Sequence, residues 1–442
     1  MAVSPFDSAI YRELLHDDEI GRLFTDDAEI QAMLRVEGAL AKAQGALGII
    51  PADSATAIER ASAALQPDPA SLAAGTGRAG IPIPALLETM REALKLPEFA
   101  QYVHWGATSQ DVMDTGLMLR LRTVCDIVDA RLRLLLQTLA DHAEAHAELP
   151  MAARTRRQTA TATSFGAVVA AWGAPLLDQL EALAQLRPRL LRVSLAGAAG
   201  NASALGAKAA ATRSALAREL ELADTDLSWH SNRAALAELA ALLTRINGAL
   251  ARMGEDCVLA AQDEVGELKL PQGAGSSTMP HKNNPITAET LVSLFQLSVA
   301  LDGAMQQALL HRQQRDGAAW SLEWHALPQI CMAAGRSLQL ALALAARLAP
   351  DADRMLANLQ GGNGLAFAEA VSFRLAAILP RAEAQARVRE LCAEAIEQGC
   401  SLAELVSQRF PDIDWQPITD PGAQLGDAPR QARGFAARAR NP

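Results

Sequence analysis

Residues 117–139 read LMLRLRTVCDIVDARLRLLLQTL, and the apolar side chains in this stretch recur every three or four positions. A second stretch, residues 236–257, has the same period. The recurring positions are Leu117, Leu121, Val124, Val128, Leu132, Leu135 and Leu139 in the first stretch, and Leu236, Leu239, Leu243, Ile246, Leu250, Met253 and Cys257 in the second. This spacing places them on one face of an α-helix, and each set spans about six turns, or roughly 33 Å. Both stretches therefore predict long helices.

Composition and proline spacing extend this prediction to most of the chain. Residues 98–149, 189–270 and 286–327 contain no proline, and alanine and leucine, which lose little side-chain freedom in a helix, dominate the sequence. Ile127 and Leu134 widen the first apolar face beyond what one neighbouring helix covers. We therefore expect an all-α fold with a central long-helix bundle that is partly buried between subunits. The alternative is a monomeric bundle.

Three regions are predicted along the chain. Residues 1–103 form an N-terminal domain of short helices, interrupted by prolines such as Pro51 and Pro67. Residues 104–345 form the central long-helix bundle domain. Residues 346–442 form a smaller C-terminal helical domain, which we expect to end in a frayed basic tail.

Charge and composition exclude several functional classes. The net charge is −10, with 40 basic residues scattered among 50 acidic ones, so the concentrated positive surface that nucleic acid requires is not expected. The sequence contains no run of 18 apolar residues, so a membrane span is not expected. The N-terminus has no signal-peptide pattern. The five cysteines are far apart and include no CxxC pair. We interpret them as reduced thiols of a cytoplasmic protein.

The most specific segment is residues 273–285, GAGSSTMPHKNNP. Small residues before two serines allow a chain to move and to approach a ligand closely. Lys282 supplies a positive donor. Asn284 and Pro285 resemble the N-cap and first position of a helix, whose free N–H groups could help to hold an anion. These groups together suit a carboxylate or a carbanion-like intermediate; the alternative is an ordinary Gly/Ser loop.

Two further segments contain candidate binding residues. Residues 103–115, VHWGATSQDVMDT, directly precede the first long helix, and Thr108 with Asp111 also fits a simple capping box. Residues 151–166, MAARTRRQTATATSFG, contain the adjacent Arg156 and Arg157. These arginines are either solvated or available to a substrate carboxylate.

Together the three segments resemble the signatures of the fumarase/aspartase superfamily, and the similarity extends over nearly the whole chain. The resemblance implies that Ser276 transfers the proton at the carbon next to a carboxylate, activated when the loop closes over substrate. It also implies a substrate-binding set: His104, Thr108, Ser109, Arg156, Gln158, Ser277, Lys282, Asn284 and Arg315. It further implies a homotetramer with D2 symmetry, in which three subunits contribute to each active site.

The sequence departs from the family pattern at several positions. Arg156 stands where the lyases carry the histidine of a Thr-His pair, Ala234 replaces an expected acid, and Gln313-Gln314-Arg315 replaces His-Glu-Arg. Arginine cannot exchange its proton near neutral pH, so it cannot protonate an amine or hydroxide leaving group. A lactonising enzyme needs no such acid, because its leaving group in the reverse direction is a carboxylate with a pKa of about 4.

Arginine in place of the histidine favours the cycloisomerase branch of the superfamily, which residues 103–115 and 320–331 also resemble. The expected reaction is the conversion of 3-carboxy-cis,cis-muconate to 4-carboxymuconolactone in protocatechuate degradation. One alternative is a superfamily lyase, such as adenylosuccinate lyase or a substituted-succinate lyase, that releases fumarate. The other is a helical scaffold that has lost its catalytic site.

No cofactor or metal is expected. The sequence lacks the glycine-rich patterns of nucleotide-binding loops. His142 and His146 lie four residues apart, but the HAEAH pattern is not HExxH and indicates a solvated charged face. His281 lies within the loop motif and could contact substrate. The expected ligand is thus a small polycarboxylate.

Overall fold

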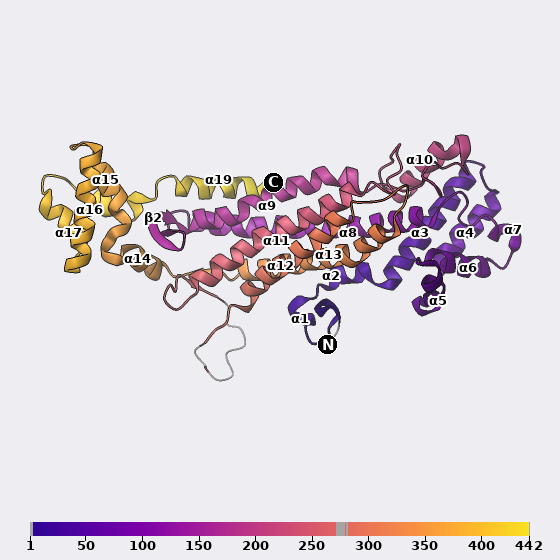
Figure 1. Ribbon diagram of the computed structural model, residues 1–442, viewed down its shortest axis with the longest axis horizontal. Coiled ribbons are helices and arrows are strands. Elements are labelled where there is room, and N and C mark those ends of the chain that lie inside the picture. The colour runs from indigo at the N-terminus through magenta and orange to yellow at the C-terminus, as the bar shows by residue number, and fades with distance from the viewer. Residues whose placement is uncertain (1–2, 271–278, 280–281, 442) are drawn as a thin grey trace. The chain divides into compact units, whose positions relative to one another are not determined.

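The computed structural model of the chain describes residues 3–270, 279 and 282–441. These residues form two compact units, and five long helices contribute to both (Figure 1). The first unit comprises residues 1–130, 181–247 and 294–336, and the second comprises residues 131–180, 248–293 and 337–442. The shared helices are α8 (Ser109–Ala145), α9 (Phe165–Leu190), α11 (Ala234–Ala260), α12 (Ile286–Gln307) and α13 (Gly317–Ala345). The all-α prediction is confirmed, whereas the division at residues 103 and 345 stays a prediction.

Helices α8 and α11 contain the two periodic stretches. In α11, every recurring apolar position of the second stretch is buried. In α8, the recurring positions of the first stretch are buried from Leu121 to Leu139, and Leu117 is half-buried. Leu134, which is not one of these recurring positions, is 55% exposed. The predicted long helices are therefore confirmed, and their apolar faces form the core.

The first unit adds short helices around these long ones. They are α1 (Arg12–Leu15), α2 (Asp18–Gly21), α3 (Asp26–Ala46), α4 (Ala52–Ala64), α5 (Pro69–Ala79), α6 (Ile83–Leu94), α7 (Pro97–Ala100) and α10 (Ala209–Leu220), with the 3-10 helices η1 (Pro5–Asp7), η2 (Arg22–Phe24) and η3 (Gly206–Lys208). Proline lies in the first turn of α5, α6 and α7. A proline there loses no hydrogen bond, because the first helical N–H groups have no partner within the helix.

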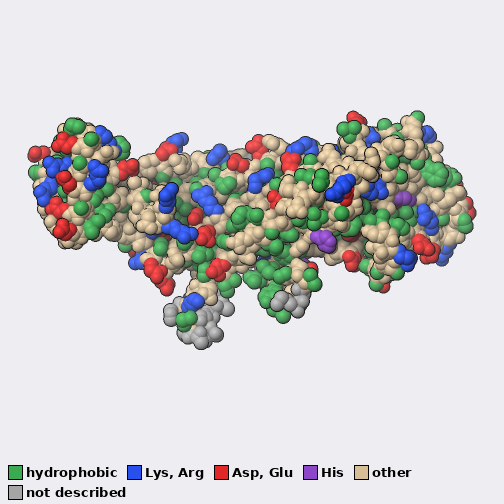
Figure 2. Space-filling model, in the orientation of Figure 1, with side chains coloured by type: hydrophobic (Ala, Val, Ile, Leu, Met, Phe, Trp, Pro, Cys, Tyr) green, Lys and Arg blue, Asp and Glu red, His purple; other side chains and the backbone are tan. Residues whose placement is uncertain are grey.

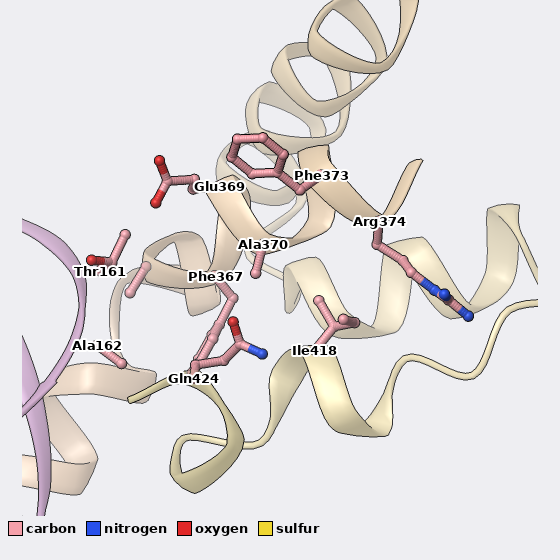
Figure 3. Close-up of a pocket in the computed structure, with 10 residues that line it drawn as sticks. Thr161, Ala162, Phe367, Glu369, Ala370, Phe373, Arg374, Ile418 and Gln424 are labelled. Carbon is pink, nitrogen blue, oxygen red and sulfur yellow. The ribbon is translucent and has the colours of Figure 1, made fainter. Parts of the chain in front are cut away.

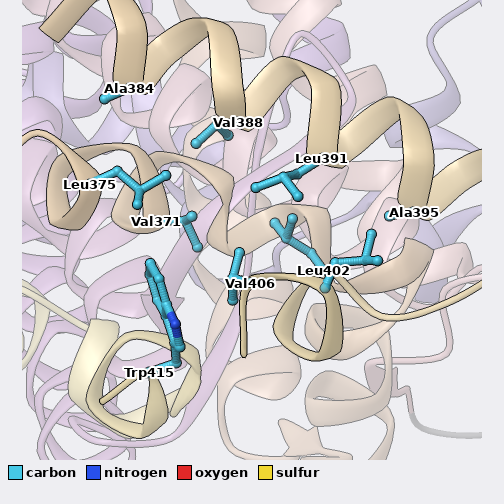
Figure 4. Close-up of a cluster of buried hydrophobic side chains, with 10 residues drawn as sticks. Val371, Leu375, Ala384, Val388, Leu391, Ala395, Leu402, Val406 and Trp415 are labelled. Atoms are coloured by element: carbon cyan, nitrogen blue, oxygen red, sulfur yellow. The ribbon is translucent and has the colours of Figure 1, made fainter. Parts of the chain in front are cut away.

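The second unit adds two short sheets and a C-terminal group of helices. Strand β1 (Pro150–Thr155) pairs with β2 (Gln158–Ser164), and β3 (Leu268–Lys269) pairs with β4 (Ala349–Pro350), both antiparallel. The helices are α14 (Ala352–Gln360), α15 (Ala368–Leu375), α16 (Arg381–Gln398), α17 (Leu402–Arg409), α18 (Gln416–Thr419) and α19 (Ala428–Arg440), with η4 (Gly362–Phe367) and η5 (Gly422–Gln424). Val371, Val388, Leu402 and Trp415 belong to a buried cluster that joins α15, α16 and α17 (Figure 4).

The expectation of a frayed C-terminal tail was wrong. Helix α19 extends to Arg440, and its Phe435 is only 2% exposed. Phe435 packs on Gly173 of α9, where even a Cβ atom would approach the phenyl ring to 2.1 Å. Arg433 pairs with Glu148, and Arg440 pairs with Glu144 near the end of α8. The acidic face around HAEAH is therefore occupied by arginines of α19.

Helix α11 is long and apolar enough, by these two criteria alone, to cross a membrane. Its 18-residue window has a mean hydropathy of 1.3, and 61% of that window is buried inside the protein. A core helix meets the same criteria, so this is weak evidence for a membrane span, and the absence of a membrane partner stays a prediction. On the face shown in Figure 2, basic and acidic side chains are interspersed.

All five cysteines are free. Cys125 and Cys257 are buried, and burial raises the pKa of each thiol to about 12. These thiols are therefore protonated at neutral pH and have little nucleophilic reactivity.

The β1–β2 hairpin turns on the two arginines noted in the sequence. Arg156 and Arg157 have φ angles of 51° and 65°, and Thr155 pairs with Gln158 on either side of them. Two consecutive residues with positive φ define a type I′ turn, which strongly favours Asn-Gly because other residues are strained there. The tip is thus a strained turn in which two long cationic side chains replace the preferred residues.

We expect the double variant Arg156→Asn/Arg157→Gly to be more stable than the wild type by about 1 kcal/mol, because the new residues tolerate positive φ. Thermal unfolding monitored by circular dichroism measures the change, and each single variant should give part of it. An unchanged or lower unfolding midpoint for the double variant would contradict the assigned turn.

Candidate active site

One buried carboxylate, that of Asp111, fixes the loop before α8. Asp111 is 1% exposed and accepts five hydrogen bonds. The donors are Ser194 Oγ at 2.9 Å, Ala196 N at 2.9 Å and His230 Nε2 at 2.7 Å to Oδ1, and Thr108 N at 3.0 Å and Gly197 N at 2.9 Å to Oδ2. Burial alone would raise the pKa of Asp111, but His230 and the backbone donors outweigh it and hold the pKa below its ordinary value. The ionised carboxylate therefore ties three separate segments together.

Arg315 lies against the same loop. Its Nε donates to Gln110 Oε1 at 2.9 Å, and its Nη2 donates to Thr108 Oγ1 at 3.2 Å. Gln110 in turn donates from Nε2 to the carbonyl of His230 at 2.9 Å. The structure therefore brings together two predicted binding residues, Thr108 and Arg315, although about 200 residues separate them in the sequence.

The proposed capping box at the start of α8 is only half formed. Asp111 accepts from the backbone N–H of Thr108, as a capping box requires, but the Thr108 hydroxyl accepts from Arg315. Ser109 is the first residue of α8 and is half-buried. The Thr108 hydroxyl therefore contacts a cation from a distant segment and does not cap the N-terminus of α8.

His104 lies at the beginning of this loop, with a φ angle of 67°. Its Nδ1 is 2.5 Å from Oε1 of Glu37, a residue of α3 that is 1% exposed. The His104 side chain is only 14% exposed, so the predicted binding residue is mostly buried and is held by a buried carboxylate.

A buried arginine organises the helices behind the loop. Arg233 donates two hydrogen bonds to Asp114, at 2.6 and 3.0 Å, and two to Glu323, at 2.8 and 2.6 Å. All three residues are at most 2% exposed. Burial alone would lower the pKa of Arg233, but the two carboxylates outweigh it and raise the pKa. The guanidinium therefore stays charged and links α8 to α13 from the residue that precedes α11.

Sequence reasoning missed four of these residues. Glu37, Gln110, Asp114 and Glu323 were given no role. Glu37 and Glu323 each lie inside an apolar run, MLRVEGAL and WSLEWHAL respectively. A carboxylate on the apolar face of a predicted helix needs a buried partner, and this signal could have identified both.

The remaining predicted residues belong to the second unit or lie outside the described residues. Arg156 and Gln158 are exposed at the hairpin tip. Lys282 is exposed, Asn284 is half-buried, and α12 begins at Ile286, so Pro285 precedes the first helical residue. Ser276, Ser277 and His281 lie outside the described residues.

The second unit contains two cavities that are alternative candidate sites. One, of about 360 Å³, has an apolar floor that includes Phe367 and Ile418, while Arg374 points away from Glu369 (Figure 3). The other, of about 990 Å³, includes Arg157 and the fully buried Glu267. Glu267 is already paired with Arg154 through two hydrogen bonds of 2.7 Å. Neither cavity gathers the polar groups that the Asp111 loop brings together.

Comparison with known proteins identifies the family of the chain. A family model described as lyase matches residues 15–297. The chain belongs to this lyase family, the fumarase/aspartase superfamily that its motifs resemble. It is 37% identical to 3-carboxy-cis,cis-muconate cycloisomerase of Pseudomonas aeruginosa, over 94% of this chain and 92% of that protein. The 3-carboxy-cis,cis-muconate lactonizing enzyme of Pseudomonas putida superposes with a TM-score of 0.92 at 33% identity, covering 98% and 99% of the two chains.

A relative with another activity is also similar. Nitrosuccinate lyase of Streptomyces davaonensis is 33% identical over 92% of this chain and 89% of that protein. Family membership alone therefore does not separate ring closure from elimination.

We expect Asp111→Asn to lower the free energy of unfolding by about 3 kcal/mol, because an amide NH2 would face hydrogen-bond donors and the charge would be lost. Urea unfolding measures this change. Asp126→Asn is the control, since Asp126 is an exposed residue of the same helix that pairs with Arg187 at the surface.

The difference in unfolding free energy between wild type and Asp111→Asn should depend on pH in a defined way. The folded-state pKa of Asp111 lies below its ordinary value of 3.8. Its ionised form therefore contributes its full stabilisation above pH 3.8 and loses it as the pH falls towards the folded-state pKa. The stability difference between wild type and Asp111→Asn should be constant at higher pH and shrink below pH 3.8. A difference that grows with acidity would contradict the assignment.

Proposed function

We propose that this chain is a cofactor-independent cycloisomerase that converts 3-carboxy-cis,cis-muconate to 4-carboxymuconolactone, a step in protocatechuate degradation. The observation that carries the proposal is the pairing of Arg315 with Thr108, a fixed cation beside a hydroxyl on a loop tied down by Asp111. This arrangement suits a carboxylate. Several relatives named for this reaction, at 32–37% identity, support the proposal.

The reaction forms one C–O bond and one C–H bond, and it takes up one proton. A substrate carboxylate oxygen adds to a conjugated double bond, and the electron pair moves to the carbon next to another carboxylate. Ser276 delivers the proton to that carbon, so one proton is taken up when the lactone forms. Arg315, Thr108 and Ser109 hold one carboxylate while the negative charge develops.

The other predicted residues share the remaining charge of the substrate. Lys282, Asn284 and Ser277 hold the carboxylate next to the reacting carbon. Arg156 and Gln158 project from the hairpin tip toward the additional carboxylate. Arginine suits this task, because it stays charged and offers paired N–H donors. His104 completes the binding set.

The assembled enzyme would be a cytoplasmic homotetramer. Leu134 on α8 and Leu297 and Val299 on α12 are exposed apolar side chains on helices that otherwise form the core. They are candidates for burial against other copies of the chain. Three copies would then contribute the separate segments of each active site. We also propose the three-domain division at residues 103 and 345, on the basis of the proline spacing and helical periodicity of the sequence.

A fumarate-releasing lyase is the second candidate. The similarity to nitrosuccinate lyase favours this candidate, because the name of that enzyme indicates that its substrate is a substituted dicarboxylate. Arg156 argues against it, because no histidine stands at this position to protonate a leaving group.

We expect purified protein to remove the diene absorbance of 3-carboxy-cis,cis-muconate in the presence of a chelator, and Ser276→Ala to abolish the activity. An ultraviolet assay measures both. Nitrosuccinate and adenylosuccinate are tested in parallel for fumarate. Fumarate formation without loss of the diene would replace the proposal with the lyase alternative.

The carboxylate contact has its own test. We expect Arg315→Gln to lower kcat/KM by about 100-fold, which corresponds to about 2.7 kcal/mol of lost transition-state stabilisation. Arg312→Gln is the matched control, since the Arg312 side chain is 72% exposed and pairs with Asp316 at the surface. Equal losses in the two variants would contradict a specific role for Arg315.

A further inference from the structure

We propose that Glu37 is a positioning residue that keeps His104 as an imidazolium, so that its ring presents a cationic N–H to a substrate carboxylate beside the Thr108–Arg315 pair. The inference rests on the proposed function for the identity of the ligand, a small polycarboxylate. It assigns a role to a residue of α3 that belongs to none of the three sequence motifs.

The first observation is the isolation of the Glu37 carboxylate. Its Oε1 meets His104 Nδ1 at 2.5 Å, whereas Oε2 is buried without a hydrogen-bond partner among the described residues. Asp111, equally buried, accepts five hydrogen bonds, whereas the Glu37 carboxylate meets a single donor. An ionised carboxylate with one donor is costly to bury unless that donor carries a positive charge. The geometry around Glu37 therefore favours the charged form of His104.

The second observation is how α3 holds the loop. Glu37 and Gln44 are seven residues apart, so they lie on the same face of the helix, and each is 1% exposed. Glu37 contacts the ring of His104, and Gln44 Nε2 donates to the carbonyl of the next residue, Trp105, at 2.6 Å. His104 keeps a φ of 67°, a conformation that costs a non-glycine residue about 1 kcal/mol or more. Two buried polar side chains thus fix one strained histidine.

The net effect of the charges around His104 also favours its protonated form. Burial alone would lower the pKa of His104, and Arg91 of α6 adds to that effect. Glu37 of α3, through its charge and hydrogen bond, and Asp111 of α8 outweigh both, so the pKa lies above its ordinary value of 6.5. Nδ1 is occupied by Glu37, and Nε2 makes no hydrogen bond within the described protein. The N–H of Nε2 is therefore the group available to a ligand.

The variant Glu37→Gln distinguishes an electrostatic effect of Glu37 on His104 from a purely structural role in holding the loop. Glutamine keeps the shape and an oxygen that accepts from Nδ1, but it removes the charge. Gln44→Leu is the matched control, because it removes the neighbouring tie without changing any charge. His104→Gln identifies the histidine signal and removes the cation.

The experiment follows the His104 ring by NMR in histidine-labelled full-length protein, and the binding of tricarballylate, a tricarboxylate without a diene, by calorimetry at several pH values. In wild type we expect His104 to titrate above 6.5, and binding to weaken as the pH rises through that value. In Glu37→Gln both midpoints should fall by about one pH unit, a tenfold change in the protonation equilibrium. In Gln44→Leu both midpoints should stay in place.

Two results would overturn the inference. One is a His104 titration at or below 6.5 in wild type, or one that Glu37→Gln leaves unchanged. The other is a shifted titration while tricarballylate binding keeps its pH dependence, since Glu37 would then act on a histidine that contacts no ligand. Failure of wild type to turn over 3-carboxy-cis,cis-muconate bears on the proposed function alone, because neither readout uses that substrate.

Discussion

The buried carboxylate of Asp111 is the constraint on which the site depends. A charge removed from water needs several donors, and five hydrogen bonds from Thr108, residues 194–197 and His230 supply them. These donors come from parts of the sequence that share no local structure. The hydrogen bonds that neutralise the charge are therefore also the ones that hold the loop in place. With the loop fixed, the Thr108 hydroxyl is held where Arg315 meets it.

The same unit neutralises its other buried acids in different ways. Asp114 and Glu323 share the guanidinium of Arg233, which spans two helices and stays charged. Glu37 has one imidazole. Asp111 is shared among backbone, hydroxyl and imidazole donors. Arginine gives a permanent counterion, and histidine gives one that can titrate. Replacing such groups with apolar residues could add stability, but it would remove the geometry that they impose.

Much of the fold could be predicted from the sequence, because the apolar period of α8 and α11 is a local signal. The β1–β2 hairpin was missed, since its turn uses Arg-Arg where Asn-Gly is the usual signal, and α19 was missed because Phe435 depends on a distant glycine, Gly173. In the site, Thr108 and Arg315 were found from motif resemblance. Glu37 was not, because its partner lies 67 residues away and pairing at that range leaves no local pattern. The proton-transferring Ser276 falls outside the described residues and stays a prediction.

The substrate-binding role proposed for Arg156 would make the hairpin tip a place where specificity can change over evolutionary time. Arg156 and Arg157 are joined to the rest of the protein by a turn of two residues, and their side chains are exposed. A mutation there disturbs no packed neighbour, and the backbone strain that it alters is only about 1 kcal/mol per residue. Selection can therefore exchange the chemical group at this position one codon at a time, while the carboxylate network of the other unit stays intact. Descendants of one ancestral scaffold can acquire different substrates by this route without passing through an unfolded intermediate sequence.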